Sequence, residues 1–273
     1  MKKFLLAGVA MSALVSGSAL AADMPVKYKA PPPPVYTWTG CYGGIEGGWM
    51  GDHKRYDRDT VFGAPAPTSN DSNAISGLIG VTLGCNYQVS PWVVIGIEGD
   101  VSWTHMRNSE SFTYPASGGL TARTEVLGTD MDWLATVRGR IGMLVTPSAL
   151  LYVTGGVAFV QDKSSLSVVT AAAAALGSQF AGSDNKTLTG WTVGVGGEWK
   201  MASYFGPGWS MKAEYLYVGL PNHSFSSPMT SFNGGTPIAG AVWNTDVTRH
   251  SENIFRLGLN YSFGGYGPVV AKY

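Results

Sequence analysis

The chain has 273 residues, of which 12% are aromatic and 13% charged, and its 18 basic residues equal its 18 acidic residues in number. This balance argues against a nucleic-acid-binding surface, which needs an excess of basic residues. After the N-terminal region, no run reaches the roughly 18 consecutive apolar residues that a membrane-spanning helix requires. The length is compatible with a single domain.

The N-terminal segment predicts export from the cytoplasm. Lys2 and Lys3 precede an apolar stretch at residues 4–15, and the run Ala19-Leu20-Ala21 has the small-x-small pattern of a cleavage site. These features are typical of a secretory signal peptide. We therefore predict that residues 1–21 are removed, which leaves 16 basic and 18 acidic residues in the mature protein.

Residues 22–38 are predicted to form a proline-rich arm in the periplasm. The four prolines at 31–34 lack the backbone N–H groups that a sheet needs, and they favour polyproline II. We expect this arm to act as a spacer before the folded domain. A recognition role for the prolines is the alternative.

From residue 39 to residue 263, one pattern recurs eight times: about ten residues in which apolar side chains alternate with small or polar ones. Strands of a transmembrane β-barrel alternate in this way because one face meets lipid and the other a polar interior. The sequence therefore predicts an all-β, eight-stranded, antiparallel, up-and-down transmembrane β-barrel. The predicted strands are 39–50, 74–88, 92–105, 131–144, 150–160, 188–200, 209–218 and 254–263.

The connections between these strands alternate in length, and this alternation predicts the orientation of the barrel. Short connections are typical of periplasmic turns and long ones of extracellular loops. The short ones are 89–91, 145–149 and 201–208, and the long ones are 51–73, 106–130, 161–187 and 219–247. Both termini are then expected in the periplasm and the barrel in the outer membrane. Residues 264–273 form a tail, so that either Phe263 or Tyr273 is the aromatic residue read by the assembly machinery.

Aromatic residues near the strand ends are expected to form girdles at the two membrane interfaces. Trp191 and Trp199 share one outward face. Eight residues at ~3.4 Å each, tilted by about 40°, place them roughly 20 Å apart, close to the separation of two girdles. The predicted girdle residues are Trp49, Trp103, Trp133, Trp191, Trp199, Trp209, Tyr261 and Phe263.

The inward faces carry many charged residues. A soluble barrel such as a lipocalin would bury apolar side chains instead. Since side chains fill the interior of an eight-stranded barrel, these charges must pair. We favour a salt-bridged plug, with a narrow conducting path as the first alternative and acid/base chemistry as the second. The predicted network is Glu46, Glu98, Asp100, Asp132, Arg138, Arg140, Glu198, Lys200, Lys212, Glu214 and Arg256.

All four histidines, His53, His105, His223 and His250, fall on the side predicted to be extracellular. Capture of a metal or haem by the loops is one hypothesis. An outer-leaflet lipid-modifying enzyme is another, because residues 250–252 contain the residue types of nucleophilic catalysis. Neighbours on a strand point to opposite faces, however, which argues against a triad there. We therefore predict no catalytic residue, no metal site and no cofactor.

The two cysteines are predicted to pair. Paired positions across a hairpin sum to a constant, and the mean of Cys41 and Cys85 falls at Gly63, near the middle of the first long connection. Both have outward parity near the periplasmic rim, and the periplasm oxidises thiols. We predict a Cys41–Cys85 disulfide, with two free lipid-facing thiols as the alternative.

Seven stretches resemble a family of small outer-membrane proteins of α-proteobacteria, the outer-membrane immunogenic family. They are Ala22-Asp23-Met24-Pro25, Trp38-Thr39-Gly40-Cys41-Tyr42, Gly84-Cys85-Asn86-Tyr87-Gln88, Val137-Arg138-Gly139-Arg140-Ile141-Gly142, Tyr152-Val153-Thr154-Gly155-Gly156, Gly190-Trp191-Thr192-Val193-Gly194 and Glu214-Tyr215-Leu216-Tyr217. The resemblance implies a shared barrel, loops that differ between members, and antigenicity.

We therefore expect a structural, surface-exposed barrel that contributes to envelope integrity and displays four extracellular loops. A narrow porin-like channel for small solutes is the alternative, and the lipid-modifying enzyme is the third hypothesis. The expected partners are outer-membrane lipid and lipopolysaccharide, the assembly machinery and, through the loops, host or phage surface molecules. No nucleic-acid partner is expected.

Overall fold

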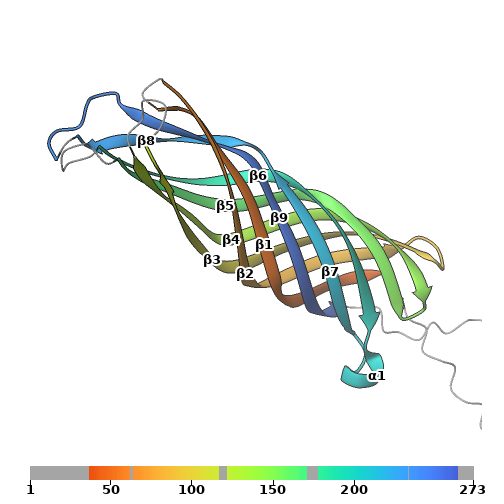
Figure 1. Ribbon diagram of the computed structural model, residues 1–273. Helices are drawn as coiled ribbons and strands as arrows, with labels where there is room; N and C mark the ends of the chain where they lie inside the picture. The colour runs from red at the N-terminus through yellow and green to blue at the C-terminus, as the bar shows by residue number, and fades with distance from the viewer. Residues whose placement is uncertain (1–36, 62–63, 117–121, 171–177, 233, 264–273) are drawn as a thin grey trace, which may run out of the picture. The chain divides into compact units, whose positions relative to one another are not determined.

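The computed structural model describes residues 37–61, 64–116, 122–170, 178–232 and 234–263 (Figure 1). The predicted signal peptide, most of the predicted arm and the predicted tail lie outside these residues. In the part of the chain that is described, no helix is long and apolar enough to cross a membrane. The elements are β1 (Gly40–Val61), β2 (Ala64–Gln88), β3 (Val93–Tyr114), β4 (Arg123–Thr146), β5 (Ala149–Thr170), β6 (Gln179–Lys200), α1 (Ala202–Phe205), β7 (Trp209–Leu220), β8 (His223–Ser231) and β9 (Val242–Phe263).

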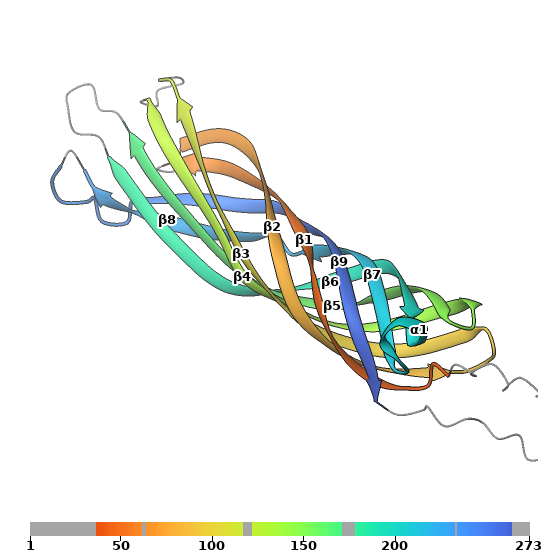
Figure 2. The same cartoon turned by 90° about the horizontal axis from the view of Figure 1, so that it is seen from below.

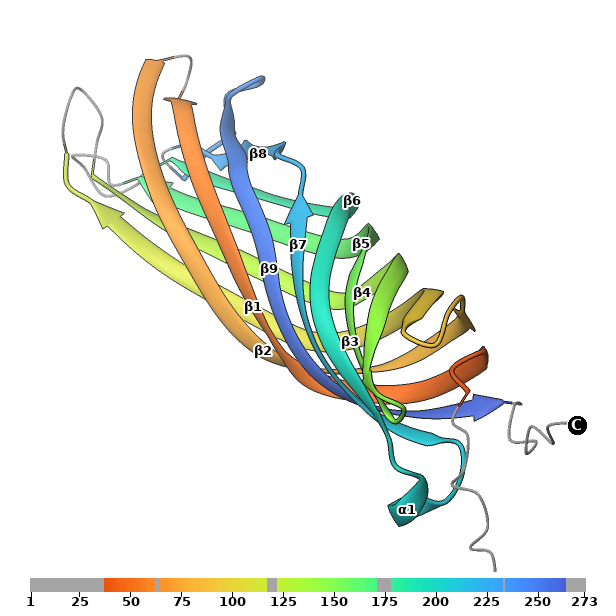
Figure 3. The same cartoon turned by 90° about the vertical axis from the view of Figure 1, so that its right-hand side faces the viewer.

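The strands pair antiparallel and close into a barrel. β9 lies between β1 and β7 (Figures 1 and 3), and Ile45 on β1 pairs with Val81 on β2 and with Leu259 on β9. The first and last strands therefore form the closing seam. We call the end where β1 begins and β9 ends the terminal end, and the opposite end the distal end.

β7 and β8 occupy a single position in the wall. Both pair with β9 in one register, since Leu220 lies opposite His250 and His223 lies opposite Val247. The break falls at Pro221, which has no backbone N–H for the ladder. Figure 2 shows β8 near the distal end and α1 at the terminal end. The wall is therefore a ring of eight strands, and the predicted up-and-down barrel is confirmed.

The strands extend far beyond their predicted distal ends. β1 has 22 residues and β2 has 25, so most of the connection predicted at 51–73 continues the sheet. At ~3.4 Å per residue and a tilt of about 40°, a 22-residue strand rises roughly 55 Å, about twice the ~25 Å height of an outer-membrane apolar band. The predictions of long loops at 51–73, 106–130, 161–187 and 219–247 were wrong for this reason.

An irregularity in β4, seen in its pairing with both neighbours, changes which of its residues face inward. The pairing of β3 with β4 shifts between Trp103 and Met106, and the pairing of β4 with β5 shifts between Asp130 and Leu134. One extra residue inverts the alternation of a strand. Met131, expected outside, is therefore fully buried in the barrel.

The interior is filled by successive layers, which follow one another along the inward face of β1. Tyr42 is nearest the terminal end, followed by Glu46, Met50, Lys54 and Tyr56, all of them buried. Met50 belongs to the middle apolar layer, which also contains Leu78, Met106, Met131, Leu134, Ala158, Val160, Leu188, Leu216, Val218, Leu220 and Ile254. Tyr56 belongs to the distal apolar layer, which also contains Leu127, Leu166, Val168, Phe180, Phe225, Met229, Trp243 and Val247.

Adjacent glycines on β5 offer a test of the strand packing. A Cβ atom at Gly156 would lie 2.1 Å from the carbonyl oxygen of Val137, whereas at Gly155 the nearest atom, the carbonyl oxygen of Thr192, is 3.6 Å away. We predict that Gly156→Ala lowers the free energy of unfolding by about 1–3 kcal/mol and that Gly155→Ala has a much smaller effect. Urea unfolding of the refolded barrel in lipid vesicles measures both. Equal effects would contradict this packing.

Candidate functional site

A charge network occupies the barrel between the terminal end and the middle apolar layer. Its members come from six strands, because the inward positions of β1, β3, β4, β6, β7 and β9 carry charges at nearly the same level. All of them are buried. The acidic members are Glu46, Glu98, Asp100, Glu198 and Glu214, and the basic members are Arg138, Arg140, Lys212 and Arg256, with Lys200 at the terminal edge.

Arg138 on β4 lies at the centre of the network. Its Nη2 atom is 2.6 Å from Glu98 Oε1 and 3.0 Å from Asp100 Oδ2. Its Nη1 atom is 2.8 Å from Glu214 Oε1. Charge-assisted hydrogen bonds of this length are among the stronger polar contacts in proteins. One guanidinium therefore joins acids from β3 and β7.

Arg256 makes a similar set of contacts from β9. Its Nη1 atom is 2.8 Å from Asp100 Oδ1, and its Nη2 atom is 2.7 Å from Glu214 Oε2. It also donates a hydrogen bond to Glu46 on β1. Asp100 and Glu214 are thus shared by Arg256 and Arg138, so the network behaves as one connected unit.

Arg140 links the network to aromatic rings. Its Nη1 atom is 3.1 Å from Glu198 Oε2 and 3.4 Å from Glu98 Oε2. Its guanidinium carbon is 4.8 Å from the ring centre of Tyr42 and 5.1 Å from that of Tyr152. Both rings stabilise the cation through cation–π contacts.

The remaining cations balance the charge of the network. Lys212 Nζ lies 3.1 Å from Glu98 Oε1 and 3.3 Å from Glu46 Oε2. Lys200 Nζ lies 4.7 Å from the ring centre of Trp38, at the terminal edge. With Lys200 included, five acidic groups face five basic ones. Such a balance offsets the cost of burying charge in a low-dielectric interior.

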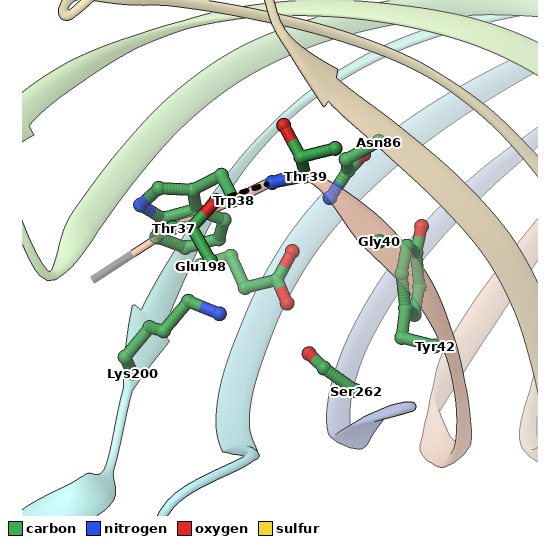
Figure 4. Close-up of a pocket in the computed structure, with 9 residues that line it drawn as sticks. All are labelled: Thr37, Trp38, Thr39, Gly40, Tyr42, Asn86, Glu198, Lys200 and Ser262. Atoms are coloured by element: carbon green, nitrogen blue, oxygen red, sulfur yellow. Dashed lines mark hydrogen bonds between the residues drawn. The ribbon is translucent and has the colours of Figure 1, made fainter. Parts of the chain in front are cut away.

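Trp38 packs inside the terminal end of the barrel (Figure 4), although the sequence placed it in the arm. Its side chain is buried, and its indole Nε1 donates a 3.2 Å hydrogen bond to the carbonyl oxygen of Pro147. The pocket beside it, which Glu198 and Lys200 help to line, has a volume of about 10 Å³. This volume is enough for about one water molecule, so little free space remains at this end.

A second buried polar group, the distal polar cluster, lies between the middle and distal apolar layers. His250 Nε2 is 3.1 Å from Glu252 Oε1 and 3.4 Å from Asp52 Oδ1. His223 Nε2 is 3.3 Å from Asp162 Oδ2. The members of the cluster are Asp52, Lys54, Asp162, His223, His250 and Glu252.

Sequence reasoning missed this cluster because most of its residues fell in predicted loops. The four histidines divide between two environments: His223 and His250 face the interior, whereas His53 and His105 are exposed outside. Ser251 pairs with the outward-facing His53 across the seam and so faces away from His250. Residues 250–252 do not form a triad.

Aromatic side chains on the outside form two rows. Trp49, Trp103, Trp133 and Trp191 lie on the distal side of the exposed apolar surface, and Trp199, Trp209, Tyr261 and Phe263 lie on its terminal side. Neighbouring strands reinforce each row. Trp103 pairs with Trp133 in the distal row, and the ring centres of Trp209 and Tyr261 are 5.2 Å apart in the terminal row. Two aromatic rows enclosing an apolar band are typical of outer-membrane barrels.

The family described as outer membrane protein beta-barrel domain matches residues 7–263 of this chain. The chain belongs to this outer-membrane β-barrel family. The 31 kDa outer-membrane immunogenic proteins of Brucella melitensis biotype 1 and Brucella suis biovar 1 are each 32% identical to it over 275 residues, which cover 96% of this chain and 100% of the relative. The resemblance inferred from sequence motifs is therefore confirmed.

Solved structures of other outer-membrane proteins were also matched. OprG from Pseudomonas aeruginosa is 10% identical, with a TM-score of 0.45 over 84% of this chain and 99% of that chain. Ail from Yersinia pestis is 13% identical, with a TM-score of 0.32 over 82% of this chain and 99% of that chain.

Ten of the eleven residues predicted for the interior of this outer-membrane barrel are buried there, and Asp132 is not. Its side chain is 45% exposed and pairs on the outside with Lys163. The bulge in β4 moves Asp132 to the outer face, and the prediction was wrong because the alternation was assumed to continue unbroken. Sequence reasoning also missed Tyr152 and Ser210, whose hydroxyl groups donate hydrogen bonds to Glu214 and Glu198. Their positions on the inward faces of their strands were the signal that could have identified them.

Cys41 and Cys85 lie opposite each other on β1 and β2 and form a disulfide in the structure. We predict that the mature outer-membrane protein, denatured without a reductant, takes up no thiol-alkylating label, and that it takes up two labels after reduction. Mass spectrometry of the intact chain measures the difference. Two labels without a reductant would show free thiols and contradict the pairing.

Proposed function

We propose that this outer-membrane protein is a closed structural barrel that supports the envelope and presents its distal end at the cell surface, and that it does not conduct solutes. The observation that carries the proposal is the filled interior. The middle apolar layer lies between the charge network and the distal polar cluster and includes the buried side chains of Met50, Met106 and Met131.

A diffusion channel needs a continuous polar path, and apolar side chains of the middle layer occupy much of the interior between the two polar regions. An ion that passed the charge network would next meet Met50, Met106 and Met131, which are all buried. Transfer of a charge into such surroundings is costly unless a partner compensates it. The narrow porin-like channel is therefore the less favoured function.

The distal half of the wall supports the surface-display part of the proposal. Beyond Trp49 and the exposed Ile75, the outward positions of β1 and the neighbouring β2 turn polar, with His53, Asp71 and Asn73 all exposed. A polar exterior is suited to water rather than to lipid. We infer that this half projects from the outer leaflet, with the short turns and both termini in the periplasm. The immunogenic naming of the Brucella relatives agrees with a surface that antibodies reach.

Planar-bilayer recording of the refolded mature protein tests this function. We expect no unitary current steps under conditions in which a wide porin, added as the positive control, conducts. Opening the middle layer by Met106→Ser with Met131→Ser is expected to produce a measurable leak. Reproducible steps from the unmodified protein would favour the channel.

A further inference from the structure

We propose that the distal polar cluster is a buried site for one divalent transition-metal ion and that zinc suits it best. The site lies inside the barrel and is separate from the charge network. Its ligands come from four strands: Asp52 on β1, Asp162 on β5, His223 on β8, and His250 and Glu252 on β9.

The donor atoms form two groups of three that share His250. One donor atom each from Asp162, His223 and His250 lie within 4.8 Å of one another, and the same holds for Asp52, His250 and Glu252. A tetrahedral zinc ion with bonds of about 2.0–2.1 Å keeps its ligand atoms roughly 3.3 Å apart. The closest pairs here, His250 with Glu252 at 3.1 Å and His223 with Asp162 at 3.3 Å, match that spacing.

The charge of the cluster also calls for a cation. Three carboxylates, from Asp52, Asp162 and Glu252, face one ammonium group, that of Lys54. With neutral histidines, the buried cluster carries two negative charges in excess, whereas the charge network is balanced. Buried charge requires compensation, and one divalent ion, or protons on the histidines and on the Glu252 carboxyl group, would supply it.

Unused donor atoms favour the metal over the protons. Within the described chain, Glu252 Oε2 has no hydrogen-bond partner and Asp52 Oδ1 has only the 3.4 Å contact with His250 Nε2, although both side chains are more than nine-tenths buried. Buried polar atoms without partners are rare and call for a reason. A bound ion would engage the carboxylate oxygens and hold both imidazoles.

The mixture of ligands selects the class of ion. Calcium and magnesium prefer sites built from oxygen alone, whereas imidazole nitrogen combined with carboxylate oxygen suits zinc and its first-row neighbours. Because apolar layers lie on both sides of the cluster, we expect the ion to enter while the barrel closes and to exchange slowly afterwards.

Metal analysis of the refolded protein tests the site. The mature protein is refolded with or without zinc chloride and desalted, and zinc is measured by plasma mass spectrometry. We expect about one zinc per chain after refolding with zinc, and much less when zinc is added only after folding. His223→Gln with His250→Gln should lose at least 80% of the bound zinc. The matched control, His53→Gln with His105→Gln, removes the exposed histidines and should keep it.

Two further measurements make the result decisive. Heat-modified migration on gels verifies that each variant forms the barrel, and the single change His223→Gln serves if the double variant does not fold. X-ray absorption at the zinc edge should show nitrogen and oxygen ligands without sulfur. The proposal is overturned if the unmodified protein refolded with zinc retains none, or if the control pair loses as much zinc as the interior pair.

Discussion

Replacing Arg138 with methionine is expected to lower the free energy of unfolding of this barrel by about 3–5 kcal/mol. The guanidinium is fully buried and lies within 3.0 Å of oxygens from Glu98, Asp100 and Glu214. Methionine fills a similar space but removes the positive charge, so that buried carboxylates lose a partner. Urea unfolding in lipid vesicles, followed by tryptophan fluorescence, measures the loss.

The exterior pair Lys163–Asp132 provides the matched control for this experiment. Its side chains are 36% and 45% exposed, and an exposed ion pair contributes only about 0–1 kcal/mol. Lys163→Met should therefore cost far less than Arg138→Met. Adding Glu214→Gln to Arg138→Met should recover part of the loss, because the two residues share one network. Strictly additive effects would contradict that coupling.

Arginine in place of Val195 is expected to destabilise the barrel by about 2–4 kcal/mol. Val195 is 55% exposed and lies midway along β6 between Trp191 and Trp199, the members of the two aromatic rows on that strand. A charge placed there meets the centre of the lipid bilayer. The same unfolding measurement applies.

Val126→Arg is the control, because it makes the same chemical change outside the apolar band. Val126 is 39% exposed on β4, on the distal side of Trp133. We expect a cost of about 0–1 kcal/mol there. Equal costs at Val126 and Val195 would mean that the band lies elsewhere on the barrel.

The half of the fold between the aromatic rows was predictable because each strand there faces lipid on one side and the packed polar interior on the other. On β6, Val193 and Val195 are exposed to the outside while Glu198 is buried inside. The alternation of apolar and polar residue types in the sequence is enough to show this difference. In the distal half the outward residues become polar and the inward ones include both Lys54 and Tyr56. The alternation of apolar outward and polar inward residues is lost there, so the sequence analysis predicted loops where the structure has strands.

The candidate sites differ in the same way. Members of the charge network such as Glu98 and Arg138 could be predicted because their odd or even position within one strand places them on its inward face. The distal polar cluster depends on pairing between strands distant in sequence, which brings Asp52 on β1 opposite Glu252 on β9. The bulge that moved Asp132 to the outer face could not be predicted, because one extra residue in a strand gives no distinctive signal in the sequence. Hairpin arithmetic sufficed for Cys41 and Cys85 because the ladder keeps one register from Gly40 to Arg58, and the shift between Arg58 and Thr60 near the tip changes the pairing by only one residue.

The position of Arg256 on the last strand has a consequence for biogenesis. β9 closes the seam against β1, and its arginine reaches Glu46, Asp100 and Glu214 on strands made earlier. Before β9 docks, these acids lack one of their cations, and joining strands so distant in the chain carries the largest loop-closure entropy. Pairing of β9 with β1 therefore closes the barrel and brings the Arg256 cation to these buried acids in the same step. A chain truncated before β9 would keep two unpaired strand edges and would lack the Arg256 cation that Glu46, Asp100 and Glu214 share in the closed barrel.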